Sequence, residues 1–129
     1  AEVDVSRRGQ IQIYRMDTAI DPGHIINPLT AAEQTEGAII YGLSGAIHSE
    51  ITLADGAVVQ KNFDTYNMMK MPEMPIHNTH LALSGGEKWG GMSEAALPSG
   101  VAAVANAIFD VTGKRVRSIP WRSNDLSWG

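Results

Sequence analysis

The first sixteen residues alternate between hydrophobic and polar side chains. Residues 1–6 carry their apolar side chains at odd positions, and residues 10–16 place two isoleucines on one face, with Arg15 as a third candidate for that face. Alternation of this kind predicts β-strands, and Gly9 supplies the turn between them. We therefore expect a β-hairpin, which needs further strands or helices to be stable.

Residues 28–48 change to helical spacing. Asn27 and Pro28 are typical of an N-cap followed by the first helical residue. A broad apolar face is formed by Leu29, Ala32, Ile39, Ile40, Leu43 and Ile47. A neighbouring face of mainly small residues is formed by Gln34, Ala38, Tyr41, Gly42 and Gly45. Because glycines within a helix cost about 1 kcal/mol each relative to alanine, this second face predicts close approach of a sheet, another backbone or a ligand.

The middle of the chain contains a second hairpin and an irregular apolar segment. Asp55-Gly56 between the runs 50–53 and 57–61 is a strong hairpin signal. Residues 62–75 are rich in methionine and contain two prolines, so we expect an apolar arm that packs on another part of the structure. A lining for a substrate channel is the alternative role for these methionines. Residues 76–83 alternate imperfectly and predict a strand.

A glycine-rich turn followed by an apolar helix organises the C-terminal third of the chain. Gly90 and Gly91 permit a tight turn, and Pro98 suits the first turn of a helix that Gly113 can end. The expected buried stripe of this helix is Val101, Val104, Ala105, Ile108 and Thr112. Glu94 is the one ionisable side chain between Lys88 and Asp110. It is therefore either a solvated or capping acid in a surface turn or a carboxylate within reach of a ligand.

After this helix, residues 115–119 are expected to form a last strand, and residues 120–129 a surface tail held by its tryptophans. The expected order is two strands, a helix, three strands, a helix and a final strand. This order predicts an α+β fold with two helices packed on a mostly antiparallel sheet.

Composition narrows the classes of function. The 129 residues fit one domain, and the net charge of −4 without a long basic cluster argues against nucleic-acid binding. The absence of cysteine excludes disulfides, a thiol nucleophile and cysteine-ligated iron–sulfur or zinc sites within this chain. No apolar run approaches the roughly 20 residues that a membrane-spanning helix needs.

Motifs that would identify a reaction are missing. The four histidines lack the spacing of metal ligands, and no phosphate-binding loop, dinucleotide-binding fingerprint or serine nucleophile motif occurs. The residues alone leave one candidate acid, Glu94, and one candidate polar ligand contact, Gln34.

Two blocks of the sequence nevertheless resemble the C-terminal end of the molybdenum-binding subunit of the xanthine dehydrogenase and aldehyde oxidase family. The first block is DPGHIINP at 21–28 with QTEG at 34–37, and the second runs from GGMSE at 90–94 through ANAIF at 105–109 to TGKR at 112–115. The branch that looks most similar contains isoquinoline oxidoreductases and bacterial aldehyde dehydrogenases. The resemblance identifies residues 1–120 as a C-terminal piece of a molybdopterin-binding domain and leaves residues 121–129 as a C-terminal tail.

The resemblance implies a molybdenum–pyranopterin cofactor and a catalytic residue, Glu94. In that family the matching glutamate acts as a general base on the hydroxyl or water ligand of the metal, and such help is worth about 10²–10⁴-fold in rate. The implied cofactor-binding residues are Gln34, Gly90, Gly91, Met92 and Ser93, and no side chain is implied as a metal ligand. Ser93 stands where glycine is usual and Ala95 where proline is usual, which puts the shape of the turn in doubt.

The resemblance also implies that most of the site lies outside this chain, either in an upstream segment or in a larger molybdenum-binding partner. Iron–sulfur clusters of the [2Fe–2S] type are expected in a partner electron-transfer subunit, because this chain has no cysteine. The substrate is expected to be a small aldehyde or N-heterocycle, oxidised with oxygen derived from water. The branch is often exported as a folded complex, which favours the periplasm over the cytoplasm.

Two other functions stay open at this point. A non-catalytic structural subunit of such a complex is suggested by the departures at Ser93 and Ala95. A stand-alone α+β ligand-binding module, unrelated to molybdenum, is the third hypothesis.

Overall fold

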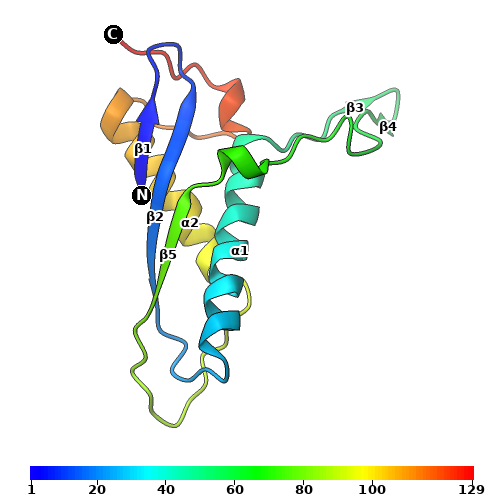
Figure 1. The fold of residues 1–129 in the computed structure, drawn as a ribbon. Helices are drawn as coiled ribbons and strands as arrows, with labels where there is room; N and C mark the ends of the chain where they lie inside the picture. The colour runs from blue at the N-terminus through cyan, green and yellow to red at the C-terminus, as the bar shows by residue number, and fades with distance from the viewer.

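The computed structural model describes residues 1–129 and contains two long helices beside a small sheet (Figure 1). The strand order in the sheet is β1-β2-β5, with β1 (Glu2–Val5) antiparallel to β2 (Ile11–Ile20) and β5 (Ile76–Leu81) parallel to β2. The predicted N-terminal hairpin is confirmed. The parallel pairing of β5 with β2 is not apparent from local sequence, because more than fifty residues separate the two strands.

A bulge in the first hairpin corrects one detail of the sequence pattern. The pairing register shifts within β1, so that Tyr14 is an extra residue in β2. An extra residue reverses the alternation of side chains, and for this reason Ile13 and Met16 are both buried while Arg15 is exposed. The expectation that Arg15 shares the isoleucine face is therefore wrong.

Both predicted helices are present, with the predicted ends. Helix α1 (Pro28–Ile47) begins at Asn27, whose Oδ1 accepts hydrogen bonds from the backbone N–H groups of Leu29 at 3.0 Å and Thr30 at 3.2 Å. Helix α2 (Ala96–Thr112) ends at Gly113 in the left-handed conformation, with φ of 69°. Local capping residues thus determine where two of the four helix ends lie.

The helices and the sheet enclose one hydrophobic core. Its buried residues are Val5, Ile13, Met16, Ala38, Ile39, Leu43, Ala46, Ile47, Ala96, Val104, Ile108, Trp121 and Leu126. Leu29, expected on the buried face of α1, is instead 69% exposed, because the first turn of α1 extends beyond the start of α2 (Figure 1).

The two helices come closest at a pair of glycines. A Cβ atom on Gly42 would lie 2.9 Å from Cγ of Leu97 and 3.1 Å from the carbonyl oxygen of Leu97, both on α2. A Cβ atom on Gly100 would lie 2.9 Å from Cγ1 of Ile39 on α1. The glycine at 42 therefore serves the approach of another helix rather than of a sheet or a ligand.

We expect Gly42→Ala to destabilise the fold by about 1–3 kcal/mol, because the added methyl group must push against the α2 backbone. The matched control is Gly45→Ala in the same helix, where an added Cβ would meet nothing within 4 Å. The free energy of unfolding of that control should rise by up to about 1 kcal/mol, because alanine has a higher helix propensity than glycine. Denaturant unfolding of the 129-residue chain measures both, and a Gly42→Ala variant as stable as the control would contradict the close crossing.

A projecting arm, residues 50–70, leaves the body between α1 and β5 (Figure 1). The predicted hairpin is confirmed, although β3 (Leu53–Ala54) and β4 (Ala57–Val58) have only two residues each, since no other strand extends them. Asp55 and Gly56 have φ of 52° and 76°, as a type I′ turn requires. The chain returns to the body through a short 3-10 helix, Met71–Glu73.

Residues 115–119 form no strand, so that prediction is wrong. The guanidinium of Arg115 lies 3.7 Å from the centre of the Phe109 ring, and its Nη1 donates a hydrogen bond to Oδ1 of Asn106 at 2.9 Å. Both partners belong to α2. The segment therefore begins by folding back along this helix instead of joining the sheet.

The C-terminal residues are held by tryptophans, as predicted, but the expectation of a surface tail is wrong, because two of their side chains lie in the core. Trp121, in a short 3-10 helix (Trp121–Ser123), and Leu126 are buried in the core, and the indole N–H of Trp128 donates to the carbonyl oxygen of Val5 at 2.7 Å. The α+β class is confirmed. The sheet beside the helices is mixed rather than mostly antiparallel, because β1 pairs antiparallel and β5 parallel to β2, while the antiparallel pair β3-β4 forms a separate sheet. Neither helix has the combination of length and hydropathy needed to cross a bilayer.

Candidate functional site

Two loops at one end of the molecule are joined to each other. The first follows β2 and contains Pro22 and Gly23, and the second, residues 84–91, follows β5. The backbone N–H of Gly90 donates to the carbonyl oxygen of Pro22 at 2.8 Å. Gly23 has φ of 78°, and a Cβ atom there would lie 2.7 Å from the carbonyl oxygen of Lys88. The glycine at 23 is therefore required both by its backbone conformation and by the close approach of the second loop.

The carboxylate of Asp21 joins these loops by hydrogen bonds. Its Oδ1 accepts hydrogen bonds from the backbone N–H groups of Gly23 at 2.9 Å and Ser84 at 3.1 Å. Hydrogen bonds from Ser84, and then the one from Gly23, hold the pKa of Asp21 below its ordinary value. His24 bonds to the carbonyl oxygen of Gly86, and its ring lies 5.0 Å from that of Trp89. The block at 21–28 thus positions the glycine-rich loop that leads to Glu94.

We expect Asp21→Ala to loosen residues 84–90 without unfolding the core. Amide hydrogen exchange of Ser84 and Gly90 should become faster, whereas Asp64→Ala on the projecting arm should leave both unchanged. Since the folded pKa of Asp21 is lowered, its contribution is complete above the ordinary carboxyl pKa of about 3.9 and is lost as the pH falls through the folded value. Unchanged exchange in Asp21→Ala would show that other contacts hold the loop.

Gln34 links the first helix to the turn before Glu94. Its Nε2 donates a hydrogen bond to the carbonyl oxygen of Ser93 at 2.6 Å. On the other side of Glu94, the backbone N–H of Leu97 donates to the Glu94 carbonyl oxygen at 3.1 Å. These bonds fix the backbone on both sides of Glu94, although its own side chain has no hydrogen bond or ion pair within the chain. The residues that the resemblance pairs, Gln34 and Glu94, are therefore neighbours.

A small open cavity of about 180 Å³ lies at this junction. Its lining residues are Gln34, Gly37, Ala38, Tyr41, Glu94 and Leu97. An added Cβ on Gly37 would meet nothing within 4 Å, so this glycine keeps one wall of the cavity open. The arrangement places a free carboxylate and a fixed carboxamide around space that a ligand could enter.

The remaining predicted site residues lie on the turn itself. Gly91 has φ of 86° and open space where a Cβ would be, and Met92 is half-buried. Ser93 does not have a positive φ, so its side chain is accommodated without left-handed strain. Ala95 has φ of −59°, an angle that proline also adopts. The backbone at 93 and 95 is therefore compatible with the residues found there.

A histidine beside the site has a role that spacing did not reveal. The side chain of His77 is 5% exposed; its Nδ1 lies 3.5 Å from Oε1 of Glu36, and its Nε2 lies 3.1 Å from Oγ1 of Thr18. His77 and His80 lie on opposite faces of β5, as predicted, and only the first is directed inward. This contact joins α1 to the sheet two residues after Gln34. Strand alternation at 77–81 was the signal that could have indicated an inward histidine.

Thr35, in the block at 34–37, faces the interior of the structure. Its hydroxyl is buried and donates to the carbonyl oxygen of Ala31 at 2.9 Å. Successive residues of this block therefore contact the turn, the helix interior, the sheet and the open cavity. No cluster of three or more histidine, aspartate or glutamate side chains is placed to hold a metal ion. A metal next to Glu94 would take its ligands from a cofactor or from other protein groups.

Comparison with known proteins places this arrangement in a family. Residues 1–75 match the model of the molybdopterin cofactor-binding domain. The chain is 31% identical to the isoquinoline 1-oxidoreductase subunit beta of Brevundimonas diminuta, over 95% of this chain and 16% of that protein. It is 30% identical to the aldehyde oxidoreductase molybdenum-binding subunit of Escherichia coli K12, over 89% of this chain and 17% of that protein.

A solved structure shows the same fold. The crystal structure of quinoline 2-oxidoreductase from Pseudomonas putida 86 superposes with a TM-score of 0.77 at 19% identity, over 92% of this chain and 16% of that one. The chain thus spans about a sixth of the length of these proteins. The chain belongs to the molybdopterin cofactor-binding domain family, in the group that includes the molybdenum-binding subunits of xanthine dehydrogenase and aldehyde oxidase enzymes.

Proposed function

We propose that this chain is the C-terminal part of the molybdenum-binding subunit of an oxidoreductase, and that Glu94 is its general base. The single observation that carries the proposal is the hydrogen bond of 2.6 Å from Gln34 to the Ser93 carbonyl, which joins the two family blocks next to Glu94. A carboxylate held by its backbone but free at its side chain is suited to accept a proton from a reactant.

The residues on the turn fit one side of a pterin cofactor. The backbone N–H groups of Gly91, Met92 and Ser93 have no hydrogen-bond acceptor within the chain. Oε1 of Gln34 likewise accepts no hydrogen bond within the chain, whereas its Nε2 donates to the Ser93 carbonyl oxygen. Successive free N–H groups beside a left-handed glycine are suited to bind the polar or anionic edge of a cofactor. We propose that these groups and Gln34 hold the pterin group on this side.

The cofactor, when bound, supplies the centre that takes up two electrons from the substrate. The chain supplies the base: Glu94 accepts the proton that water loses as its oxygen adds to an electron-poor carbon. Gln34 orients the turn that carries Glu94 through its hydrogen bond to the Ser93 carbonyl. General-base help of this kind lowers the barrier by about 3–5.5 kcal/mol.

The names of the relatives indicate two classes of substrate. The similar proteins are named for an aldehyde, an isoquinoline and a quinoline. We propose that the substrate is an aldehyde or an aromatic N-heterocycle, each of which offers an electron-poor carbon to water. Iron–sulfur clusters would lie in a partner subunit, since this chain has no cysteine to ligate them.

The reaction class is tested on the complete complex purified from its source. Molybdenum and pterin should be present in equal amounts, and a panel of aldehydes and N-heterocycles should be oxidised with an artificial electron acceptor. Turnover in ¹⁸O-labelled water should place the label in the product. A complex without molybdenum and pterin, or a product that takes its oxygen from O₂, would overturn the proposal.

A further inference from the structure

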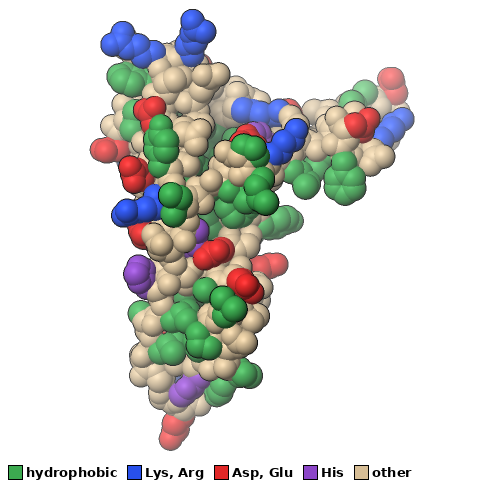
Figure 2. Space-filling view, viewed as in Figure 1, with side chains coloured by type: hydrophobic (Ala, Val, Ile, Leu, Met, Phe, Trp, Pro, Cys, Tyr) green, Lys and Arg blue, Asp and Glu red, His purple; other side chains and the backbone are tan.

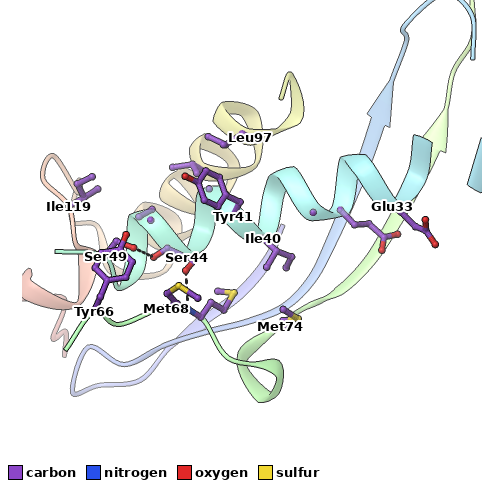
Figure 3. Close-up of a pocket in the computed structure, with 17 residues that line it drawn as sticks. Glu33, Ile40, Tyr41, Ser44, Ser49, Tyr66, Met68, Met74, Leu97 and Ile119 are labelled. Carbon is purple, nitrogen blue, oxygen red and sulfur yellow. Dashed lines mark hydrogen bonds between the residues drawn. The ribbon is translucent and has the colours of Figure 1, made fainter. Parts of the chain in front are cut away.

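A long apolar groove runs along the side of α1 and adjoins the cavity at Glu94, with which it shares Gly37, Tyr41 and Leu97. Its volume is about 790 Å³, and its apolar lining includes Ile40, Tyr41, Met68, Met69, Met74 and Ile119. Figure 3 shows Glu33 at one end of the groove and Tyr66 and Ile119 toward the other. The sequence predicts that the methionines pack against another part of the structure, yet most of them line open space.

The wall formed by the returning arm is fixed by polar contacts. Oγ of Ser44 accepts a hydrogen bond from the backbone N–H of Met69 at 2.9 Å. Nε2 of His48 lies 3.0 Å from Oε1 of Glu73, and Oε2 of Glu73 accepts from the backbone N–H of Lys70 at 2.7 Å. These contacts join the returning chain to α1 at Met69 and at Glu73. The groove is therefore present before anything fills it.

Apolar side chains continue from the groove onto the arm. On the arm, Phe63 is 81% exposed and Leu53 is 73% exposed, and Met71 in the 3-10 helix that follows the arm is 81% exposed. Figure 2 shows hydrophobic side chains along the arm and where the arm meets the body. Exposed apolar side chains that continue from a groove of this size are typical of an interaction surface.

The polar end of the groove indicates the charge of its occupant. Glu33 has no ion-pair or hydrogen-bond partner, and the only such partner of Glu36 is His77. No lysine or arginine lines the groove. A second copy that docked groove to groove would therefore bring no cation to Glu33, whereas a segment with a basic residue at its end would.

We propose that the groove and the arm receive an apolar segment of the remaining part of the same molybdenum-binding subunit, with a lysine or arginine at its end facing Glu33. This inference rests on the proposed function. Its support is the length of the relatives, of which this fold makes up only 16–17%, together with the charge of the groove. The rest of such a subunit is long enough to supply a segment that covers the groove and the arm.

The test is photo-cross-linking in the complete complex. A benzophenone amino acid replaces Met68 in the groove, and the control places it at Asp110, an exposed position on α2 outside the groove. After irradiation, mass spectrometry should find position 68 joined to an apolar peptide of the same subunit with a lysine or arginine at one end. Position 110 should not give that peptide.

Cysteine variants provide a second test in case the bulky benzophenone side chain prevents folding. Since the chain has no cysteine, Met68→Cys and Asp110→Cys each introduce the one thiol of this segment. We expect alkylation in the native complex to be at least about tenfold slower at 68 than at 110, because an occupied groove excludes the reagent.

The outcomes separate this inference from the proposed function. Cross-links to an iron–sulfur subunit or to a second copy, or equal alkylation at both positions, would overturn the inference even if the complex contains molybdenum and oxidises its substrate. A complex that lacks molybdenum but gives the expected cross-link would overturn the function and leave the groove assignment intact.

Discussion

Replacing Glu94 by glutamine should lower kcat by about 10²–10⁴-fold while molybdenum and pterin contents stay at the wild-type level. Glutamine has nearly the same shape, but its neutral amide cannot accept the proton that leaves the attacking water. The Glu94 side chain makes no hydrogen bond or ion pair within the chain, so its replacement removes no contact that the fold needs. The loss should therefore be confined to turnover.

The matched control is Glu87→Gln, an exposed acid on the glycine-rich loop that does not line the cavity at Glu94. This control should keep wild-type kcat and cofactor content. Both variants are compared in the complete complex by steady-state assay, metal analysis and pterin release. Turnover of Glu94→Gln at the wild-type rate would contradict the assignment of the base. Loss of cofactor from that variant would instead make Glu94 a residue that holds the cofactor.

Helix ends and tight turns could be predicted because their causes are local. Asn27 and Gly113 satisfy backbone groups at the ends of the helices, and the Asp55-Gly56 pair adopts the angles of a hairpin turn. Each depends on residues within a few positions. The bulge at Tyr14 is different, because it becomes apparent only when β1 and β2 are aligned in space.

The strand wrongly predicted at 115–119 also shows that local sequence does not reveal tertiary contacts. Its apolar and polar residues alternate weakly, but Arg115 finds both an aromatic ring and an amide on α2. Those contacts are tertiary and override a short local pattern. The parallel pairing of β5 with β2 is likewise set by the long connection through α1 and the arm.

The candidate site could be predicted only in part. Spacing alone identified Glu94 and Gln34 as separate candidates, and the family resemblance was needed to relate them. Their proximity through the Ser93 carbonyl depends on where α2 crosses α1, which the glycines at 42 and 100 control. The contact of Glu36 with His77 could not be predicted from histidine spacing, because it depends on where α1 packs against β5.

The second large effect is expected at the C-terminal end, where Trp121→Ala should destabilise the fold by about 3–5 kcal/mol. Trp121 is 3% exposed and belongs to the core with residues of α1 and α2. Its removal leaves a cavity that the sheet and helices cannot fill without moving. The side chain of Asn124 also donates to the carbonyl oxygens of Pro120 at 3.1 Å and Trp121 at 3.3 Å, which holds the surrounding backbone in place.

A second tryptophan offers a matched control for this prediction. Trp89 is 63% exposed and contacts the ring of His24 at the surface, so Trp89→Ala should change stability by no more than about 0.5 kcal/mol. Denaturant unfolding of both variants shows whether a loss of stability comes from removing a buried side chain or from removing any tryptophan. Equal small losses would mean that residues beyond 120 are not part of the folded core. The expected difference would instead make Trp121 a required part of the core against which α1 and α2 pack.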